Sequence, residues 1–448
     1  MTINRSFTVP APVAEVLSYH QHPGALPRLS PPWVPVRIEA QAEALDHGEA
    51  VLRFPGGVRW VARHTPSARP DEFVDQLVSL PLRWRHTHTF DAVGDTATRV
   101  SDRVDTPVPG RLLRQMFRYR QDQLVGDMAA HRLATTLLEQ QGRSRRLTVA
   151  ITGASGLVGS SLSALLSTGG HRVVHLVRRP AHGDAERQWE PERPAPELFD
   201  DVDVVVHLAG ATIAGRFTAR HKSLIAASRI GPTSRLANAM TSSMRPPSTL
   251  VTASAIGFYG AARGDEVLTE SSRAGDDFLA GVVREWEDAA TAARRGGIRV
   301  VQVRTGIVQS PRGGVLRLLR PLFAAGLGGP LGTGSHWLSW IDLDDLCDIY
   351  YRAAVDERID GPINAVAPVP VTNQDYSSTL ARVLRRPCMV RVPELGPQIL
   401  LGREGTRSLA LASQRVEPRR LGDVGHQFRW PDVESCLRHQ LGRLPSPA

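Results

Sequence analysis

The glycine-rich string TGASGLVG at residues 152–159 is the clearest place where residue types and spacing could do chemistry. It follows the apolar segment LTVAIT and precedes SSLSALLSTGG, which has the pattern of a helix. The first glycine permits a tight turn, the second lets the backbone approach a pyrophosphate, and the third lets helix and strand pack closely. The string therefore predicts a dinucleotide-binding turn. We expect its contacts from Gly153, Ser155, Gly156, Leu157, Val158 and Gly159.

Arg178 and Arg179, which follow the next apolar segment, bear on which dinucleotide binds. A carboxylate at this point would bind the ribose hydroxyls of NAD, whereas an arginine can pair with a 2′-phosphate, which favours NADP(H). The alternative is coincidence, because 53 of the 54 basic residues are arginine and Lys222 is the single lysine. The third apolar segment ends in Leu208, Ala209 and Gly210, where we expect the chain to pass under the adenine and its ribose.

Three polar residues near the ends of later apolar segments could take part in a reaction. Ser254 follows segment 249–253 at the end where ligands bind in open α/β sheets, and Tyr259 comes five residues later. A tyrosine there could donate a proton to a substrate carbonyl, so Ser254 and Tyr259 are candidate catalytic residues. Ser254 and Arg304 are also candidate cofactor contacts. The alternative is that Ser254 only hydrogen-bonds cofactor or backbone and Tyr259 packs the loop.

A parallel sheet is the element that would bring these residues together. Beyond residue 146, continuous apolar runs alternate with helical patterns, which is typical of a parallel sheet covered on both faces. The runs are 147–152, 172–177, 202–208, 249–253 and 299–304. We therefore expect a Rossmann α/β domain over 147–367 and a small helical C-terminal subdomain over 368–448 that completes the substrate cleft.

Residues 1–141 follow a different pattern and predict a separate α+β domain. Segments with a period of two predict an antiparallel meander, and a helical run with one apolar face extends from Pro109-Gly110 to Gln141. The segments are 36–44, 50–54, 58–64, 72–80, 84–92 and 96–105. Residues 142–146 are a polar linker to the second domain.

The chain from about 147 to 440 resembles the extended short-chain dehydrogenase/reductase superfamily, of the nucleotide-sugar epimerase type. The strings that carry the resemblance occur in that family's order: TGASGLVG (152–159), DVVVHLAG (203–210), SAIGFYG (254–260) and VRTGIV (303–308). Longer strings such as GLGGPLGTGSHWLSWIDLDDL (326–346) resemble its epimerase-like branch, sometimes labelled cell-division inhibitor. The resemblance implies an NAD(P)-binding Rossmann fold and a small-molecule substrate.

The N-terminal region resembles the START/Bet v 1-like helix-grip fold of polyketide cyclase/dehydrase-like proteins. The resemblance is carried by VPAPVAEVLSYHQHPGALPRLSP (9–31) and FRYRQDQLVGDMAAHR (117–132). It implies a curved antiparallel sheet that wraps a long helix around an apolar cavity. An apolar or amphipathic ligand in this domain is therefore a further expectation.

The catalytic pair of the short-chain dehydrogenase family is missing from this sequence. In that family a Tyr-x-x-x-Lys tyrosine acts as general acid/base, and its lysine depresses the pKa of the tyrosine and holds the ribose. The single lysine is Lys222, and the residue four before it is Thr218. The matching helix reads LAGVVREWE (279–287), and Ala255 stands where the family has a serine. The catalytic step is thus left open.

Composition excludes several other classes. The net charge of +9 is spread over residues 1–146 (+4) and 147–448 (+5), so we expect no nucleic-acid partner. No apolar run could span a bilayer and the N-terminus lacks a signal-peptide core, so we expect a cytoplasmic protein without a membrane span. The three cysteines are scattered. His86 and His88 would share one face of a strand, but without a third ligand in view we expect no metal.

Two functions remain. The leading one is an NADP-binding epimerase/reductase-like protein that acts on a carbonyl or alcohol by hydride transfer without the Tyr-x-x-x-Lys pair. The other is a non-catalytic dinucleotide-binding regulatory protein or apolar-ligand carrier. The oligomeric state is not predicted by the sequence.

Overall fold

The computed structural model describes residues 1–444 and divides them into two units. The first contains residues 1–139, 163–171 and the C-terminal segment from 439, and the second contains residues 140–162 and 172–438. The domain boundaries expected at residues 141, 146 and 367 stay predictions. Within the described residues, no helix is both long and apolar enough to cross a membrane.

The N-terminal unit is a seven-stranded sheet of order β1-β7-β6-β5-β4-β3-β2, all of whose neighbours are antiparallel. The predicted meander and the predicted long helix are thus confirmed. The elements are β1 (Thr2–Val9), α1 (Val13–Gln21), α2 (Ala25–Leu29), β2 (Arg37–Ala40), β3 (Glu49–Arg53), β4 (Arg59–Thr65), β5 (Glu72–Leu77), β6 (Arg85–Ala92), β7 (Thr98–Asp105) and α3 (Gly110–Gln140).

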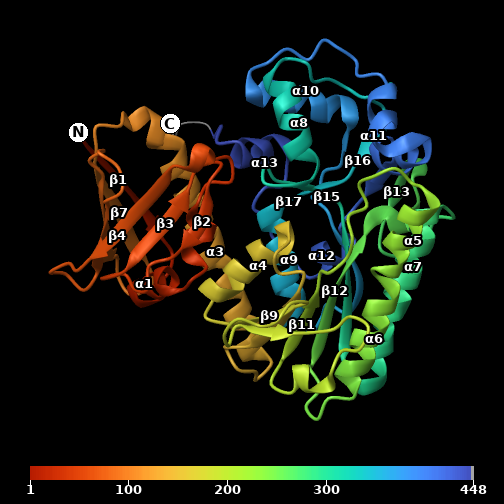
Figure 1. Cartoon of the computed structure of the whole chain (residues 1–448), viewed down its shortest axis with the longest axis horizontal. Helices are drawn as coiled ribbons and strands as arrows, with labels where there is room; N and C mark the ends of the chain where they lie inside the picture. Colours follow the sequence, from red (N-terminus) through yellow and green to blue (C-terminus); the bar gives the residue numbers. More distant parts are fainter. Residues whose placement is uncertain (445–448) are drawn as a thin grey trace. The chain divides into compact units, whose positions relative to one another are not determined.

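Helix α3 runs along one face of this sheet (Figure 1). Two apolar clusters join helix and sheet: Leu124 and Met128 pack in one that includes Phe73, and Leu113 and Phe117 pack in the other. In β6 and β7 every second residue is buried, as expected for a sheet that is covered on one face only. The inner face of the sheet is therefore the face that α3 covers.

The second unit is built on a seven-stranded parallel sheet of order β10-β9-β8-β11-β12-β14-β18. The predicted parallel α/β architecture is confirmed. The strands are β8 (Thr148–Thr152), β9 (Arg172–Val177), β10 (Glu186–Gln188), β11 (Val204–His207), β12 (Thr249–Ala255), β14 (Arg299–Thr305) and β18 (Gly361–Ala365). All the central strands are buried on both faces, as the continuous apolar runs predict.

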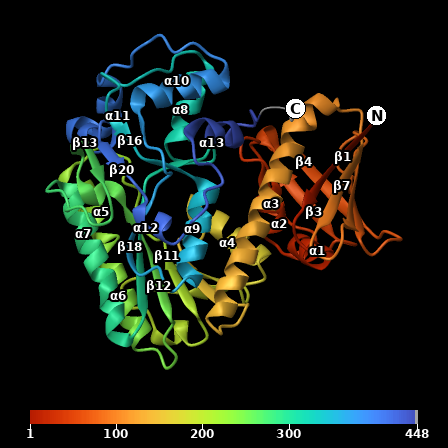
Figure 2. The ribbon, with the colours of Figure 1, turned by 180° about the vertical axis from the view of Figure 1, so that it is seen from behind.

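Helices cover this sheet on both faces (Figures 1 and 2). Residues of α6 and α7 form one core cluster with Ala150, Val205, Leu250 and Val300, which lie in one register row of the sheet. Helix α9 is buried along nearly its whole length and contacts β12 and β14. The helices are α4 (Leu157–Thr168), α5 (Ala219–Ala227), α6 (Ile230–Thr241), α7 (Phe278–Thr291) and α9 (Leu343–Val355).

Outside the parallel sheet, the second unit forms short strand pairs and further helices, most of them after β14. Three two-stranded sheets pair β13 with β20, β15 with β17 and β16 with β19. The strands are β13 (Ala262–Leu268), β15 (Ile307–Gln309), β16 (Trp337–Leu338), β17 (Trp340–Asp342), β19 (Val371–Thr372) and β20 (Ser413–Val416). The helices are α8 (Gly314–Ala324), α10 (Asn373–Leu384), α11 (Leu395–Gly405), α12 (Arg419–Asp423) and α13 (Val433–Gln440). The C-terminal region, expected to be helical and loop-rich, also contains strand β20.

Candidate functional site

The glycine-rich turn joins the carboxyl end of β8 to α4. Gly153 has a φ of 69°, and a side chain there would place its Cβ 2.9 Å from the carbonyl carbon of Leu208. A Cβ on Gly159 would lie 2.3 Å from the carbonyl oxygen of Gly153. These two glycines are thus required by the backbone conformation and by close packing, as the sequence predicts.

Gly156 differs from the other two glycines because the space around it is open. A Cβ on Gly156 would have one close neighbour, the carbonyl oxygen of Gly153 at 3.2 Å. Ser155 and Gly156 are exposed, and Leu157 and Val158 are half-buried at the start of α4. An exposed turn that leads into a helix presents backbone N–H groups and the positive end of the helix dipole, the combination that binds phosphate.

The two arginines after β9 are exposed but have different partners. Arg179 donates two hydrogen bonds to Glu186, of 2.6 and 2.7 Å, and this pairing raises the pKa of Arg179. Arg178 makes no side-chain hydrogen bond or ion pair with another of the described residues. Of the two predicted phosphate-binding arginines, Arg178 is therefore the one whose guanidinium is available.

His207 ends β11 as a neutral, fully hydrogen-bonded residue. The Thr152 hydroxyl accepts from the backbone N–H groups of Leu208 and Ala209, so its own hydrogen goes to His207 Nδ1, 2.7 Å away. Nε2 then donates to the Thr233 hydroxyl at 3.0 Å. Burial lowers the pKa of His207 to about 4. The network fixes the end of β11, and with it the half-buried Leu208 and Ala209 and the exposed Gly210, next to the glycine-rich turn.

Ser254, Arg304 and Asn364 lie side by side in register on β12, β14 and β18. The Ser254 hydroxyl donates to Glu287 of α7 at 2.5 Å. The Arg304 guanidinium donates to both oxygens of Glu287, at 2.9 and 2.8 Å, and lies 3.5 Å from the centre of the Phe258 ring. The candidate residues Ser254 and Arg304 are thus brought together by a carboxylate for which the sequence predicts no role.

Tyr259 closes the same cluster, and its side chain is 0% exposed. Its hydroxyl donates to Asn364 Oδ1 at 2.6 Å and accepts from Arg304 Nη1 at 3.1 Å. Burial raises the pKa of Tyr259 despite the opposing charge of Arg304. In this conformation the Tyr259 hydrogen is held by Asn364, so a transfer to substrate requires that hydrogen bond to be exchanged.

Helix α7 carries no tyrosine at the positions where the family has its catalytic pair. Val282 and Val283 are buried, and Trp286 donates from its ring N–H to the Thr233 hydroxyl at 3.0 Å. The single lysine lies elsewhere: Lys222 of α5 pairs with Glu404 at 2.6 Å. The absence of the Tyr-x-x-x-Lys pair is therefore not compensated by a lysine from another element.

Glu287 and Asn364 were not predicted from the sequence. Glu287 lies in a helical string whose charged residues usually face solvent, and only its burial against β14 marks it as a partner of Arg304. Glu285 and Asp288 flank it on the same helix and are exposed, so the sequence does not distinguish Glu287 from them. Asn364 lies in β18, a strand that is absent from the predicted apolar runs.

A glycine-rich turn between the first strand of a parallel sheet and its helix, with a basic residue exposed after the second strand, defines a dinucleotide-binding protein of the Rossmann type. Residues 149–365 match the NAD dependent epimerase/dehydratase family, and residues 392–440 match a domain of unknown function, DUF1731. The epimerase family protein Mb2239 of Mycobacterium bovis is 38% identical over 298 residues, which are 66% of this chain and 98% of that protein. The chain therefore belongs to the NAD-dependent epimerase/dehydratase family.

Two solved structures extend this finding. A nucleoside-diphosphate sugar epimerase from Corynebacterium glutamicum is 43% identical, with a TM-score of 0.86, and the match covers 98% of this chain and 90% of that chain. Human epimerase family protein SDR39U1, solved with NADPH, is 29% identical with a TM-score of 0.60 and covers 66% of this chain and 100% of its own. The first match includes both units, so their combination in one chain also occurs in the corynebacterial protein.

Proposed function

We propose that this chain binds NADP(H) at the glycine-rich turn and transfers hydride to or from a carbonyl or alcohol substrate. The observation that carries the proposal is the contrast among the three glycines: Gly153 and Gly159 are packed, whereas Gly156 and Ser155 leave an exposed turn at the start of α4. A ligand phosphate fits such a turn because Ser155 and Gly156 are exposed at the N-terminal end of α4. The NADPH found with human SDR39U1 supports the same cofactor here.

Arg178 is the residue that we propose selects NADP(H) over NAD(H). It follows the carboxyl end of β9, is exposed, and is not engaged by the carboxylate that holds Arg179. A charge-assisted hydrogen bond to a phosphate contributes about 1.5–3 kcal/mol, which corresponds to a preference of at least tenfold. Segment 208–210, which is half-buried at Leu208 and Ala209 and exposed at Gly210, would line the nucleoside, and Gly153, Leu157 and Val158 would hold the turn beneath the pyrophosphate.

When bound, the cofactor supplies or accepts the hydride, and the protein must supply position and a proton. Ser254 and Tyr259 are our candidates for the proton step. Each hydroxyl already donates within the protein, to Glu287 and to Asn364. The proposal therefore requires substrate to replace at least one of these acceptors, with Arg304 beside Tyr259 favouring the deprotonated form of the tyrosine.

The same hydrogen bonds favour a second candidate function, a dinucleotide-binding protein that does not catalyse a reaction. A buried tyrosine whose hydroxyl has both a donor and an acceptor is satisfied as a structural residue. The missing Tyr-x-x-x-Lys pair also supports this candidate. The two functions differ in turnover, not in cofactor binding.

Fluorescence titration of the full chain with NADPH and NADH tests the cofactor proposal. We expect tighter binding of NADPH, and we expect Arg178→Ala to lose about tenfold in NADPH affinity while NADH affinity changes little. Arg172→Ala is the matched control, because Arg172 is an exposed arginine at the opposite end of the same strand. Equal affinity of the wild type for both dinucleotides would contradict the role of Arg178.

Turnover distinguishes the two candidate functions. NADPH oxidation is followed with aldehydes and ketones, and NADP⁺ reduction with alcohols that include UDP-glucose, since the corynebacterial relative is described as a nucleoside-diphosphate sugar epimerase. Catalysis predicts that Tyr259→Phe lowers kcat by at least tenfold while NADPH affinity is retained. Activity that survives Tyr259→Phe unchanged would remove Tyr259 from the mechanism.

For the N-terminal unit we propose the helix-grip fold and an apolar or amphipathic ligand. The order of elements supports it: a strand, two short helices, six further antiparallel strands and a long helix. The two apolar clusters beneath α3 supply the hydrophobic surface that such a ligand needs.

A further inference from the structure

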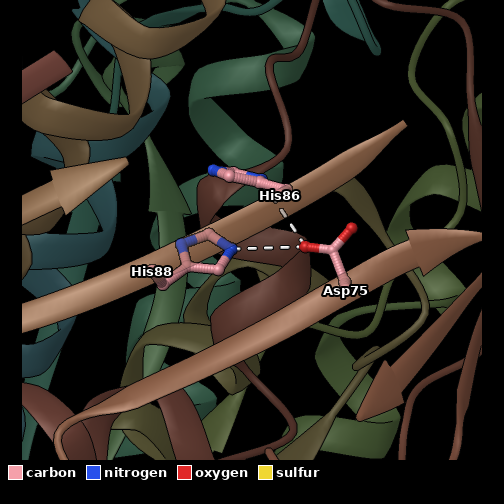
Figure 3. Close-up of side chains that lie close together, drawn as sticks. All are labelled: Asp75, His86 and His88. Atoms are coloured by element: carbon pink, nitrogen blue, oxygen red, sulfur yellow. Dashed lines mark hydrogen bonds and ion pairs between the residues drawn. The ribbon is translucent and has the colours of Figure 1, made fainter. Parts of the chain in front are cut away.

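Two histidines and two aspartates converge on the inner face of the N-terminal sheet. His86 and His88 lie two residues apart on β6, so their side chains share one face. Asp75 of β5 is directly opposite His86, and Asp102 of β7 is directly opposite His88. Figure 3 shows His86, His88 and Asp75 from these neighbouring strands pointing toward one another. Four polar side chains thus meet in a region otherwise buried between two apolar clusters.

We propose that Asp75, His86 and His88 bind a divalent transition-metal ion, with zinc as the best fit. Asp75 Oδ2 lies 3.5 Å from His86 Nδ1 and 3.3 Å from His88 Nε2. All three ligand atoms lie within 4.8 Å of one another. With bonds of about 2.0–2.1 Å, the ligands of a tetrahedral zinc ion lie about 3.3 Å apart. Two of the three edges of the site therefore already have the length that zinc requires.

Asp102 faces the other ring nitrogen of each imidazole. Its Oδ1 lies 2.9 Å from His86 Nε2 and 2.8 Å from His88 Nδ1. Each histidine thus turns one nitrogen toward Asp75 and the other toward Asp102. Metal-binding histidines usually present this arrangement, in which a carboxylate fixes the ring and raises its basicity. Asp102 is therefore a positioning residue, and Asp75 is the ligand.

Hydrogen bonding within the protein leaves this cluster incomplete. The side chains of His86, His88 and Asp102 are 7%, 4% and 3% exposed. His88 Nδ1, although close to Asp102, makes no well-oriented hydrogen bond with the described residues, and the bond from His88 Nε2 to Asp75 is long at 3.3 Å. Buried carboxylates are costly unless they are paired or bind a metal. A divalent cation between Asp75 and the two rings would replace the long contacts of Asp75 with bonds to the metal and would leave His88 Nδ1 as an N–H group facing Asp102.

Three protein ligands leave one position of a tetrahedral zinc site open, as in catalytic rather than structural sites. That position would take water or an oxygen atom of a ligand. Arg120 of α3 interacts electrostatically with Asp102. The two carboxylates balance the charge of a divalent ion, and Arg120 then leaves the site with a net charge of +1. An anionic oxygen such as hydroxide or a carboxylate would neutralise it. The site therefore favours an amphipathic ligand with a carboxylate or ionisable hydroxyl group.

Zinc binding to the full chain, prepared without a histidine tag, tests the proposal. After removal of metal with a chelator, calorimetric titration with Zn²⁺ should show one ion per chain. We expect the double variant His86→Gln/His88→Gln to lose at least a hundredfold in affinity. We expect Asp102→Asn to keep the stoichiometry and lose about 10–100-fold. His47→Gln is the control, because His47 is an exposed histidine of the same unit and should bind zinc as the wild type does.

Two further measurements complete the test: Co²⁺ absorption reports the geometry of the site, and a folding measurement shows whether each variant has its native structure. Co²⁺ should give the intense visible absorption of a tetrahedral site in the wild type and in His47→Gln, and Asp75→Asn should weaken or shift it. Far-UV circular dichroism and urea unfolding of the full chain show whether the N-terminal unit of each variant is folded. A wild type that takes up no Zn²⁺ would overturn the proposal, and so would a folded double variant that binds Zn²⁺ as tightly as the wild type.

Discussion

Each unit contains a buried cluster of charged and polar side chains, and these two clusters differ in how their carboxylates are hydrogen-bonded. In the epimerase unit, Glu287 accepts from Ser254 and from two nitrogens of Arg304, so both its oxygens are satisfied at 2.5–2.9 Å. In the N-terminal unit, the polar side-chain contacts of Asp75 with described residues are those of 3.5 and 3.3 Å to His86 and His88. The first cluster is complete within the protein, whereas the second is not.

This difference indicates that the Glu287 cluster stabilises the fold around the candidate active site, whereas the Asp75 cluster can itself bind a ligand. A saturated network stabilises the fold because each of its groups would lose a partner if another were removed. An unsaturated cluster gains its stabilisation from what binds there, by mass action. We therefore expect substitutions in the two clusters to differ in their effect on stability and in whether a ligand changes that effect.

The largest expected effect is that of Glu287→Gln. Removing this charge leaves the buried guanidinium of Arg304 without its partner, and breaking a buried ion pair on one side costs about 3–5 kcal/mol. Asp75→Asn, measured without metal, should cost less because the contacts of Asp75 are long. Urea unfolding of the full chain, with hydrogen exchange assigning each transition to a unit, gives both values.

Glu285→Gln is the matched control for this prediction, because Glu285 lies on the same helix two residues away and is exposed. We expect it to change the free energy of unfolding by less than about 0.5 kcal/mol. If Asp75→Asn without metal were as destabilising as Glu287→Gln, the two clusters would be equivalent, and the distinction between a saturated and an unsaturated cluster would fail.

A second prediction concerns the pH dependence of the epimerase unit, through His207, which lies outside the Glu287 cluster and is hydrogen-bonded to Thr152 and Thr233. Burial lowers the pKa of His207 from 6.5 to about 4, and no charged group contributes to this shift. The unfolded chain binds a proton between these two values and the folded chain does not, so stability falls as pH falls from 6.5 towards 4. At pH 5 this residue alone should cost about 2 kcal/mol relative to pH 8.

The measurement compares wild type and His207→Gln at pH 8 and pH 5, by hydrogen exchange in peptides from β11 and β12. Glutamine keeps polar contacts to Thr152 and Thr233 but does not titrate, so the variant should lose about 2 kcal/mol less than the wild type on acidification. The same loss in both proteins would show that His207 is not the group that titrates. Other buried histidines contribute equally to both proteins and cancel.

The sequence predicts the epimerase unit well where the signal is local. The glycine spacing predicts the turn, because Gly153 and Gly159 meet steric limits set by residues a few positions away and by the end of β11. The long apolar runs predict the central strands, and the register then aligns Ser254 with Arg304. Glu287 joins these two side chains, but it lies on α7, and no local sequence pattern indicates its role.

The N-terminal cluster illustrates the same limit. The spacing of His86 and His88 correctly predicts that the two rings share a face, and their centres lie 3.8 Å apart. The third ligand, Asp75, and the positioning residue, Asp102, are fixed by the pairing of three antiparallel strands. That register depends on turns and on packing against α3, which a single sequence does not reveal. The expectation of no metal is based on His86 and His88 without a third ligand, and it stays a prediction that the zinc titration tests.

The smallest expected effect on the free energy of unfolding is that of Lys222→Ala, because it removes an ion pair that is partly exposed rather than buried. Lys222 pairs with Glu404 at 2.6 Å, but both side chains are partly exposed, and pairs of this kind contribute about 0.2–1 kcal/mol. Since this lysine has no tyrosine four residues before it and lies on α5, the variant should bind NADPH as the wild type does. Urea unfolding and NADPH titration measure both quantities. A loss of NADPH affinity above about fivefold would place the single lysine in the cofactor site, and the epimerase unit would then contain a replacement for half of the missing pair.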